Sequence, residues 1–129
     1  MLTGDLGAGK TTFIQGFLRG AGIQRRAPSP TFVIMRHYKL PRRPAKPWPF
    51  VSIHHMDAYR LKAGEEKGQP QLAALGFDDL VKDPANLILI EWGERIAKAL
   101  PREAIKITFG YGKKEGERKI TITRPASYL

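Results

Sequence analysis

Cysteine is absent from the 129-residue chain. This absence excludes disulfide scaffolds, zinc ribbons, iron–sulfur clusters and catalysis by a thiol. The sequence also lacks an apolar run of the roughly 20 residues that a membrane span requires. Its N-terminus has neither the basic start nor the apolar stretch of a signal peptide. We therefore expect a cytoplasmic protein with no membrane segment, and the length favours a single domain over residues 1–129.

Acidic side chains are scarce, with 12 Asp and Glu against 22 Lys and Arg and a formal net charge of +10. The excess is local, because residues 24–62 hold nine of the basic side chains and Asp57 as their only acid. Such a segment indicates a polyanionic partner more strongly than a uniformly basic surface does. A solvated basic loop is the alternative explanation of the same charge.

Four prolines stand between residues 41 and 49, in a stretch that also carries three basic side chains. Proline at this density excludes a helix and disfavours a central strand, so the stretch predicts an extended loop. Runs rich in apolar residues flank it at 31–38 and 50–56, and they are typical of strands. Together these features predict a hairpin with a long basic tip.

The remaining patterns predict an α/β domain with a mixed sheet. Apolar residues at helical spacing favour helices, a continuous apolar run favours a buried strand, and alternation favours half-buried strands. On these criteria the helices cover 10–19, 71–75, 77–81 and 93–100, the buried strand 87–90, and the alternating strands 105–109 and 120–122.

The start of the chain matches the phosphate-binding P-loop pattern G-x-x-x-x-G-K-[ST], formed by Gly4, Asp5, Leu6, Gly7, Ala8, Gly9, Lys10 and Thr11. The glycines let the backbone approach a phosphate, and the N–H groups of the loop and of the following helix attract its charge. Lys10 is expected to contact the β- and γ-phosphates, Thr11 to bind Mg²⁺, and Thr12 to add a hydrogen bond. A strand should precede the motif, but none is evident in the short stretch before Gly4, so an incidental glycine-rich loop is the alternative.

A P-loop enzyme needs a further acid, which holds Mg²⁺ through water or activates the attacking water. In open α/β sheets such groups lie where strands end. Glu91 follows the buried strand at 87–90, and Asp57 follows the strand at 50–56. The alternatives are a helix-capping or surface role for Glu91 and an ion pair with Arg60 for Asp57.

Residues beside these acids carry further interpretations. Trp92 is either a core or rim aromatic, or else a lid over the nucleotide or a contact with a partner. His54 and His55 point to opposite faces of a strand, and His55 and Asp57 alone do not make a zinc site. We therefore expect a structural or hydrogen-bonding role for His55.

Four stretches, in this order and at these spacings, resemble the bacterial TsaE (YjeE) family: residues 4–13, Ser29-Pro30-Thr31-Phe32, His55-Met56-Asp57-Ala58-Tyr59-Arg60-Leu61 and Ile90-Glu91-Trp92. Gly76-Phe77 with Asp78-Asp79 is similar to the family as well, and the resemblance runs from Leu2 to about Ile122. Many NTPases share the P-loop alone. Its combination with Ser-Pro-Thr-Phe and His-x-Asp-x-Tyr-Arg is far more specific.

The resemblance implies a P-loop NTPase-like three-layer fold with a mixed, mainly parallel central sheet. It also implies a small ATPase that uses ATP and Mg²⁺ and works with the TsaB and TsaD proteins. Together these proteins make the threonylcarbamoyl modification of the adenosine next to the anticodon in tRNA.

The family's functional positions carry over onto this sequence by motif. Lys10 and Thr12 are implied to bind phosphate, Thr11 and Glu91 to hold Mg²⁺, and Asp57 to be needed for hydrolysis. Near the nucleotide the resemblance places Trp92 and, as a switch-type segment beside the γ-phosphate, Ser29-Pro30-Thr31-Phe32.

The sequence departs from the family in two places. Members carry a helix and a strand before the P-loop, and we expect this N-terminal strand/helix region to be missing here, with part of the base-binding pocket. The loop at 41–49 is longer than the expected turn, so the basic hairpin at 36–49 is a candidate for contact with tRNA or an acidic partner. Two other hypotheses are a P-loop small-molecule kinase and a nucleotide- or RNA-binding module whose hydrolysis is impaired by the short N-terminus.

Overall fold

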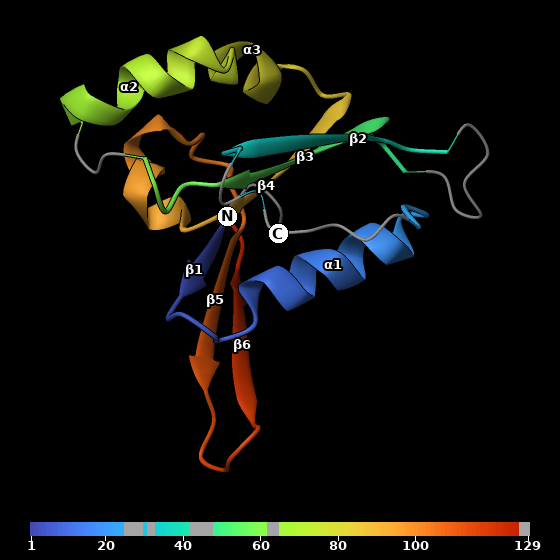
Figure 1. Cartoon of the computed structure of the whole chain (residues 1–129), viewed down its shortest axis with the longest axis vertical. Coiled ribbons are helices and arrows are strands. Elements are labelled where there is room, and N and C mark those ends of the chain that lie inside the picture. The colour runs from blue at the N-terminus through green and yellow to red at the C-terminus, as the bar shows by residue number, and fades with distance from the viewer. Residues whose placement is uncertain (25–29, 31–32, 42–47, 62–64, 127–129) are drawn as a thin grey trace.

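The computed structural model describes residues 1–24, 30, 33–41, 48–61 and 65–126, with backbone alone at 65–69. Within these residues the centre is a six-stranded sheet with the order β2-β3-β4-β1-β5-β6 (Figure 1). The four central strands run parallel, and the edge strands β2 and β6 run antiparallel to their neighbours, so the sheet is mixed and mainly parallel, as predicted. The strands are β1 (Leu2–Gly4), β2 (Met35–Lys39), β3 (Ser52–Asp57), β4 (Asn86–Glu91), β5 (Lys106–Tyr111) and β6 (Arg118–Thr123).

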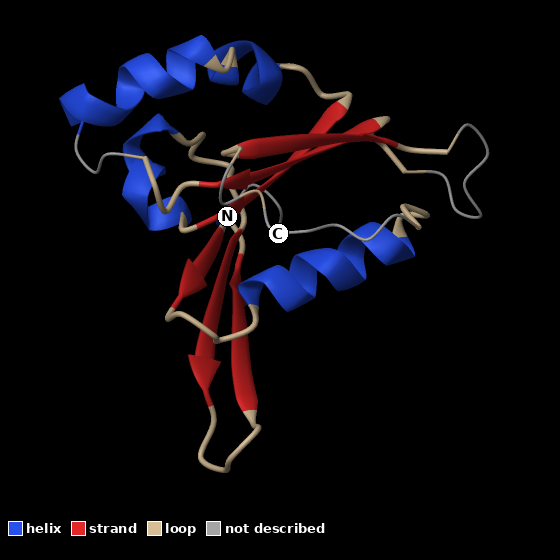
Figure 2. Ribbon diagram, in the orientation of Figure 1, coloured by secondary structure: helices blue, strands red, loops and turns tan. Residues whose placement is uncertain are grey.

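Helices cover both faces of the sheet, which gives the predicted three layers (Figure 2). Because residues two apart on a strand share a face, the apolar side chains divide into two cores. Ile53 and Leu89 pack with α1 in one core, and Met56 and Ile90 pack with the other helices in the second. The helices are α1 (Lys10–Gly20), α2 (Glu65–Ala74), α3 (Phe77–Lys82) and the 3₁₀ helix η1 (Gly93–Ala99). No helix in the described ranges is long and apolar enough to cross a membrane.

A three-residue strand, β1, precedes the P-loop, although its length left no strand evident in the sequence. It pairs in parallel with β5 over its whole length and with β4 at Leu2, so it occupies the middle of the sheet. Its last residue, Gly4, has a φ of 133°, and a side chain there would collide with the carbonyl group of Phe109. The loop that follows therefore starts from a fixed point at the carboxyl end of the parallel strands.

Most predicted elements are present with shifted ends. β2 starts at Met35, later than the predicted start at residue 31, and β3 covers 52–57 in place of 50–56. Residues 31–32 and 42–47, which include most of the predicted proline-rich tip, lie outside the described residues. α2 is longer than the predicted helix at 71–75 because it begins at Glu65 and continues through Pro70.

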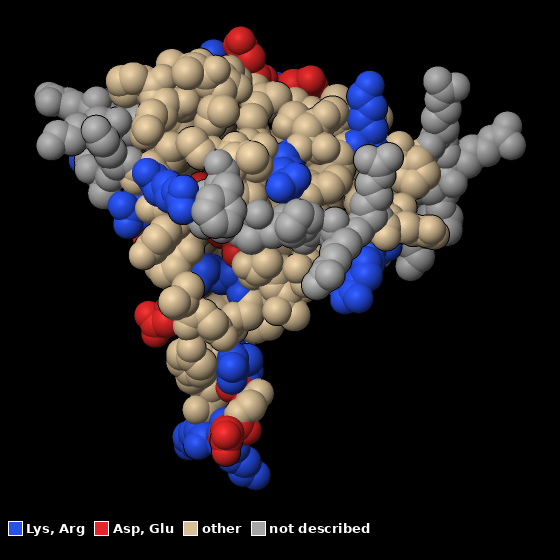
Figure 3. All heavy atoms as spheres, viewed as in Figure 1, with Lys and Arg blue, Asp and Glu red and all other residues tan. Residues whose placement is uncertain are grey.

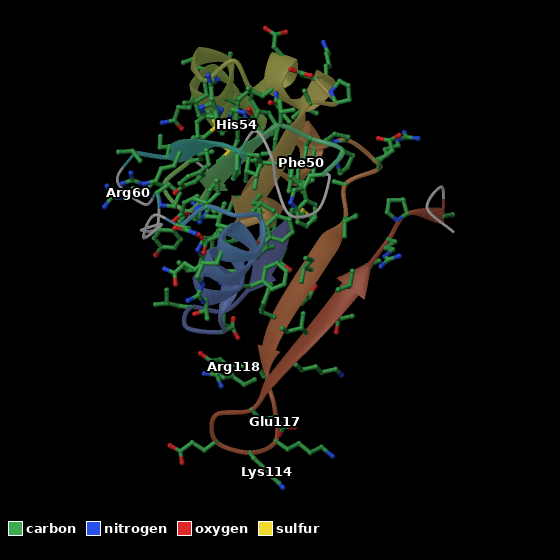
Figure 4. All side chains as sticks on the ribbon, turned by 90° about the vertical axis from the view of Figure 1, so that its right-hand side faces the viewer. Phe50, His54, Arg60, Lys114, Glu117 and Arg118 are labelled. Atoms are coloured by element: carbon green, nitrogen blue, oxygen red, sulfur yellow. The ribbon has the colours of Figure 1, made fainter. Side chains whose placement is uncertain are left out.

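The prediction of a half-buried strand at 120–122 is wrong about burial. All residues of β6 are exposed, and Ile120 and Ile122 keep 50% and 54% of their surface accessible. β6 pairs with β5 at the end of the sheet, and the tip of this hairpin, with Lys114 and Glu117, extends away from the body of the molecule (Figure 4). The alternation of apolar residues thus indicated the strand correctly, but the described helices do not cover it.

Replacing Gly4 with alanine is expected to lower the free energy of unfolding by about 2 kcal/mol or more, because the added Cβ is strained at this φ and collides with Phe109. Chemical denaturation measures the change. Gly16→Ala is the matched control, since its added Cβ meets no atom within 4 Å apart from the neighbouring backbone of its own helix, and alanine is the better helix former by about 1 kcal/mol. Similar effects of the two substitutions would contradict the close approach at Gly4.

Candidate functional site

The loop after β1 and the carboxyl ends of β3 and β4 enclose a cavity of about 370 Å³. Open α/β sheets bind their ligands at this end of the strands. Nine predicted site residues, from three separate parts of the chain, line the cavity: Leu6, Gly7, Gly9, Lys10, Thr11, Thr12, Asp57, Glu91 and Trp92. Tyr59 completes the lining and was not among the predicted site residues. Gly4, Asp5 and Ala8 do not line it, although the first two hold Lys10 through their carbonyl groups.

The backbone of the loop is shaped by glycines with positive φ. Gly7 has a φ of 76° and Gly9 a φ of 107°, a region that side chains disfavour. Gly9 occupies the N-cap position of α1, and no side-chain hydrogen bond caps this helix. The N–H groups of the first turn are therefore free to bind an anion.

Lys10 is a buried cation, with 5% of its surface exposed. Its ammonium group donates to the carbonyl oxygens of Gly4 and, at 2.8 Å, Asp5, and it lies 4.1 Å from the centre of the Trp92 ring. No carboxylate of the described residues forms an ion pair with it. Because a buried charge is costly without an opposite charge, Lys10 makes the cavity favourable for an anionic ligand.

Glu91, the last residue of β4, has both carboxylate oxygens engaged. Oε1 accepts a hydrogen bond of 2.6 Å from the Thr11 hydroxyl, and Oε2 lies 2.7 Å from Nε2 of His55. Glu91 is 3% exposed and His55 is fully buried. The predicted hydrogen-bonding role of His55 is thus present in the structure, and Glu91 faces the loop instead of lying on the surface.

Asp57, the last residue of β3, stands directly opposite Glu91 in the paired strands. Opposite residues of paired strands share a face, so the two acids line the same cavity. Oδ1 of Asp57 accepts a hydrogen bond of 2.9 Å from the backbone N–H of Tyr59. This bond fixes the carboxylate at the strand end.

Trp92 has a left-handed backbone conformation, with φ 58° and ψ 38°, which is uncommon for a bulky residue. Its ring lies beside that of Tyr59, with centroids 5.1 Å apart, and Arg95 lies 5.6 Å from the centre of the Tyr59 ring. Trp92 is therefore a rim aromatic that forms one wall of the cavity. Sequence reasoning missed Tyr59 and Arg95, although Tyr59 belongs to the His-x-Asp-x-Tyr-Arg stretch.

A second cavity, of about 590 Å³, adjoins the loop between α1 and the β5–β6 hairpin. The hydroxyl of Tyr111 donates to the carbonyl of Leu6 at 2.7 Å and so ties the hairpin to the loop. Sequence patterns did not predict this cavity, because its aromatic residues have the spacing of ordinary core positions. Its lining includes Phe13, Phe17, Phe109, Arg118 and Ile120.

The two adjacent histidines of β3 make different contacts. His55 reaches Glu91, whereas Nε2 of His54 lies 3.3 Å from Asn86 Oδ1 and its ring stacks on His37 with centroids 4.7 Å apart. Burial lowers the pKa of His54 below its ordinary value. His54 is not among the residues that line the cavity at the P-loop.

Part of the basic segment at 24–62 lies outside the described residues, which exclude 25–29, 31–32, 42–47 and 62. The predicted switch-type residues Ser29, Thr31 and Phe32 and the tip of the basic hairpin at 36–49 fall in these gaps. Elsewhere, Lys and Arg side chains gather along the β5–β6 hairpin, with acidic side chains between them (Figure 3).

A P-loop that joins a central parallel strand to a helix, with acids at the ends of β3 and β4, defines a P-loop NTPase-like protein. A crystal structure of YdiB from Bacillus subtilis has the same fold, with a TM-score of 0.69 and 31% identity over 98% of this chain and 68% of that one. The family described as "Threonylcarbamoyl adenosine biosynthesis protein TsaE" matches residues 1–120. The chain belongs to the TsaE family, which confirms the resemblance.

Curated relatives of the same family are similar over most of this chain. A tRNA threonylcarbamoyladenosine biosynthesis protein TsaE from Bacillus subtilis (strain 168) is 39% identical over 95% of this chain and 66% of its own length. The protein of the same name from Treponema pallidum (strain Nichols) is 34% identical over 95% of this chain and 78% of its own length. The chain thus spans about two thirds of the length of the first relative.

Thr11→Val keeps the shape of the side chain and removes the hydroxyl that donates to the buried Glu91 carboxylate. A hydrogen bond to a charged group contributes about 1.5–3 kcal/mol, so we expect the free energy of unfolding to fall by about that amount in chemical denaturation. Thr12→Val, at the exposed neighbouring position, is the control and should change it by less than about 0.5 kcal/mol. If both variants were equally stable, Glu91 would not depend on this bond.

Proposed function

We propose that the protein binds and hydrolyses ATP with Mg²⁺, as the ATPase subunit that acts with TsaB and TsaD in the threonylcarbamoyl modification of tRNA. The observation that carries this proposal is the convergence of the P-loop, Lys10, Thr11 and Glu91 on one cavity. Membership of the TsaE family supports the proposed role in tRNA modification, because relatives of this chain are named tRNA threonylcarbamoyladenosine biosynthesis proteins.

Lys10 and the start of α1 are suited to bind the phosphates. A phosphate oxygen is a stronger partner for an ammonium group than the carbonyl oxygens of Gly4 and Asp5, because it carries charge. Lys10 would therefore turn from these carbonyls toward the β- and γ-phosphates. The free N–H groups of the first turn of α1 and the hydroxyl of Thr12 would add hydrogen bonds on the same side of the cavity.

Thr11 and Glu91 fit a magnesium ion by the chemistry of their donor atoms. Mg²⁺ prefers oxygen ligands, and a hydroxyl and a carboxylate meet here at 2.6 Å. Among the described residues no group of three or more His, Cys, Asp or Glu side chains is arranged to hold a metal, so phosphate oxygens and water would complete the coordination. When bound, the ion supplies charge neutralisation on the phosphates.

Asp57 is suited to orient the attacking water. It is 6% exposed, its Oδ1 is fixed by the Tyr59 N–H, and its side chain lines the same cavity as Lys10. A fixed carboxylate in this position can hold the water by a hydrogen bond and accept its proton. Hydrolysis would then depend on positioning by Asp57 and on the charge of Lys10.

The second cavity is suited to the nucleotide base. It shares Gly7, Gly9 and Thr12 with the first cavity, so a ligand that extends from the phosphates reaches it directly. Phe13 and Phe109 form an apolar wall, with an edge-to-face contact at 5.5 Å between their rings. Such a surface favours a planar aromatic group.

The partners TsaB and TsaD are proposed to contact the surface around the mouth of the first cavity. Leu6 and Tyr59 line this cavity and are 81% and 51% exposed. Burial of these two side chains against a partner protein would remove apolar surface from water, which favours association. Docking there would couple the partners to the state of the nucleotide.

Lys10→Ala is expected to lower the rate of ATP hydrolysis by about 100-fold or more, because it removes charge stabilisation of the transferring phosphoryl group. Glu91→Ala is expected to impair hydrolysis in the presence of Mg²⁺ more than it impairs ATP binding in EDTA. Phosphate release in the presence of TsaB and TsaD measures the rate of hydrolysis, and calorimetry measures ATP binding in EDTA.

Lys113→Ala and Glu94→Ala change exposed residues of the same types outside the cavity and are the controls, with rates close to those of the unmodified protein. Unchanged hydrolysis in Lys10→Ala would remove the P-loop from the mechanism. Transfer of phosphate to a small acceptor, in place of release to water, would instead favour a small-molecule kinase.

The basic segment at 36–49 is proposed to contact tRNA through phosphates. Each lost phosphate contact should reduce the slope of log affinity against log salt by about 1, so the triple replacement of Arg42, Arg43 and Lys46 by glutamine should lower this slope by up to about 3 units. Binding to tRNA across a salt series measures it. A slope that does not change, or no binding at low salt, would leave the segment without an RNA role.

A further inference from the structure

Glu91 is held from two sides, and only one side belongs to the P-loop. The Thr11 hydroxyl at Oε1 comes from the first turn of α1, and the His55 ring at Oε2 comes from β3. Because both of its oxygens form hydrogen bonds, the carboxylate is held in one orientation about the Cγ–Cδ bond. The function proposed above uses Glu91 and Thr11 but assigns nothing to His55.

The sheet register explains why the imidazole of His55 reaches Glu91. β3 and β4 pair with His55 opposite Leu89 and Asp57 opposite Glu91. His55 is therefore the diagonal neighbour of Glu91 on the same face of the sheet, at a separation that long side chains span. Parallel pairing in this register brings the ring to the far side of the carboxylate from Thr11.

Among the described residues, the Glu91 carboxylate is the hydrogen-bond partner of the His55 ring. An ionised carboxylate only accepts hydrogen bonds, so the contact assigns the ring hydrogen to Nε2. The other nitrogen, Nδ1, is buried and has no hydrogen-bond partner among the described residues. An apolar side chain would fill the same space without burying an unpaired nitrogen, so packing alone does not account for a histidine here.

We propose that His55 is a positioning residue that fixes the Glu91 carboxylate for Mg²⁺ in the nucleotide complex. With Oε2 held by His55, Oε1 stays directed toward the Thr11 hydroxyl. The two oxygen atoms that would bind Mg²⁺, Oε1 of Glu91 and the hydroxyl oxygen of Thr11, therefore lie side by side. Mg²⁺ tolerates little deviation from its preferred geometry, and groups that orient a metal ligand typically change metal affinity by about 10–100-fold. This inference rests on the proposed function, because it assumes that ATP binds together with Mg²⁺.

The test compares variants that keep or remove the donor at the position of Nε2. The amide nitrogen of a glutamine reaches about as far as Nε2, whereas that of an asparagine reaches only as far as Nδ1. His55→Gln therefore retains a donor toward Glu91, and His55→Asn loses it. His55→Leu fills the space without a donor and replaces His55→Asn should that variant fail to fold in thermal denaturation.

The measured quantity is the ratio of ATP affinity in saturating Mg²⁺ to ATP affinity in EDTA, by calorimetry on the full chain. We expect His55→Asn and His55→Leu to lower this ratio by about tenfold or more, with affinity in EDTA within about threefold of the unmodified protein. His55→Gln should keep the ratio within about threefold. His54→Asn, which changes the neighbouring histidine on the other face of β3, should leave it unchanged.

A double-mutant cycle separates positioning from a general structural role. If His55 acts only through Glu91, adding His55→Asn to Glu91→Ala lowers the ratio no further. An unchanged ratio in His55→Asn and His55→Leu, or a His55→Gln variant as defective as these, overturns the inference while the proposed function stands. Failure of Mg²⁺ to strengthen ATP binding in the unmodified protein overturns the magnesium role in the proposed function and the inference with it.

Discussion

The hydrogen bond between the Thr11 hydroxyl and the Glu91 carboxylate joins positions that are 80 residues apart in the chain. It ties the first turn of α1 to the end of β4, so the glycine-rich loop is held at its helical end, while strand pairing of β1 holds it at the other end. Lys10 is the first residue of α1 and precedes Thr11, and Asp57 lies opposite Glu91 in the paired strands. The site therefore exists only when the sheet places β1 next to β4.

This arrangement places a polar cluster on the face of the sheet that also carries the apolar core with α1. Lys10, His55, Asp57 and Glu91 are all buried, and buried charged groups are costly unless they are partnered. Here the partners are backbone carbonyls, a hydroxyl, an imidazole and a backbone N–H, and they sit on strands, on the loop and on the start of a helix. Hydrogen bonds from Thr11, His55 and the Tyr59 N–H therefore orient the Glu91 and Asp57 carboxylates before any ligand arrives, which is what the electrostatic catalysis proposed above would require.

The sequence allowed much of the site to be predicted, for two physical reasons. The P-loop is local, since its eight residues are consecutive, and Asp57 and Glu91 follow apolar strands, whose ends meet at one edge of a parallel sheet. Tyr59 was missed because it joins the wall through its ring contact with Trp92, a contact between distant positions that no periodicity encodes. The exposure of β6 was missed because alternation reports which residues share a face and not whether anything covers that face.

The same exposed hairpin bears on how copies of the protein meet one another. β6 ends the described sheet, and an edge strand presents unpaired backbone groups to which a strand of another molecule can bind. Ile120 and Ile122 would add apolar contact to such pairing, but Arg118 and Lys119 on the same strand place like charges against each other when two copies approach. The like charges on the β5–β6 hairpin thus oppose pairing between copies of the protein, independently of any ligand.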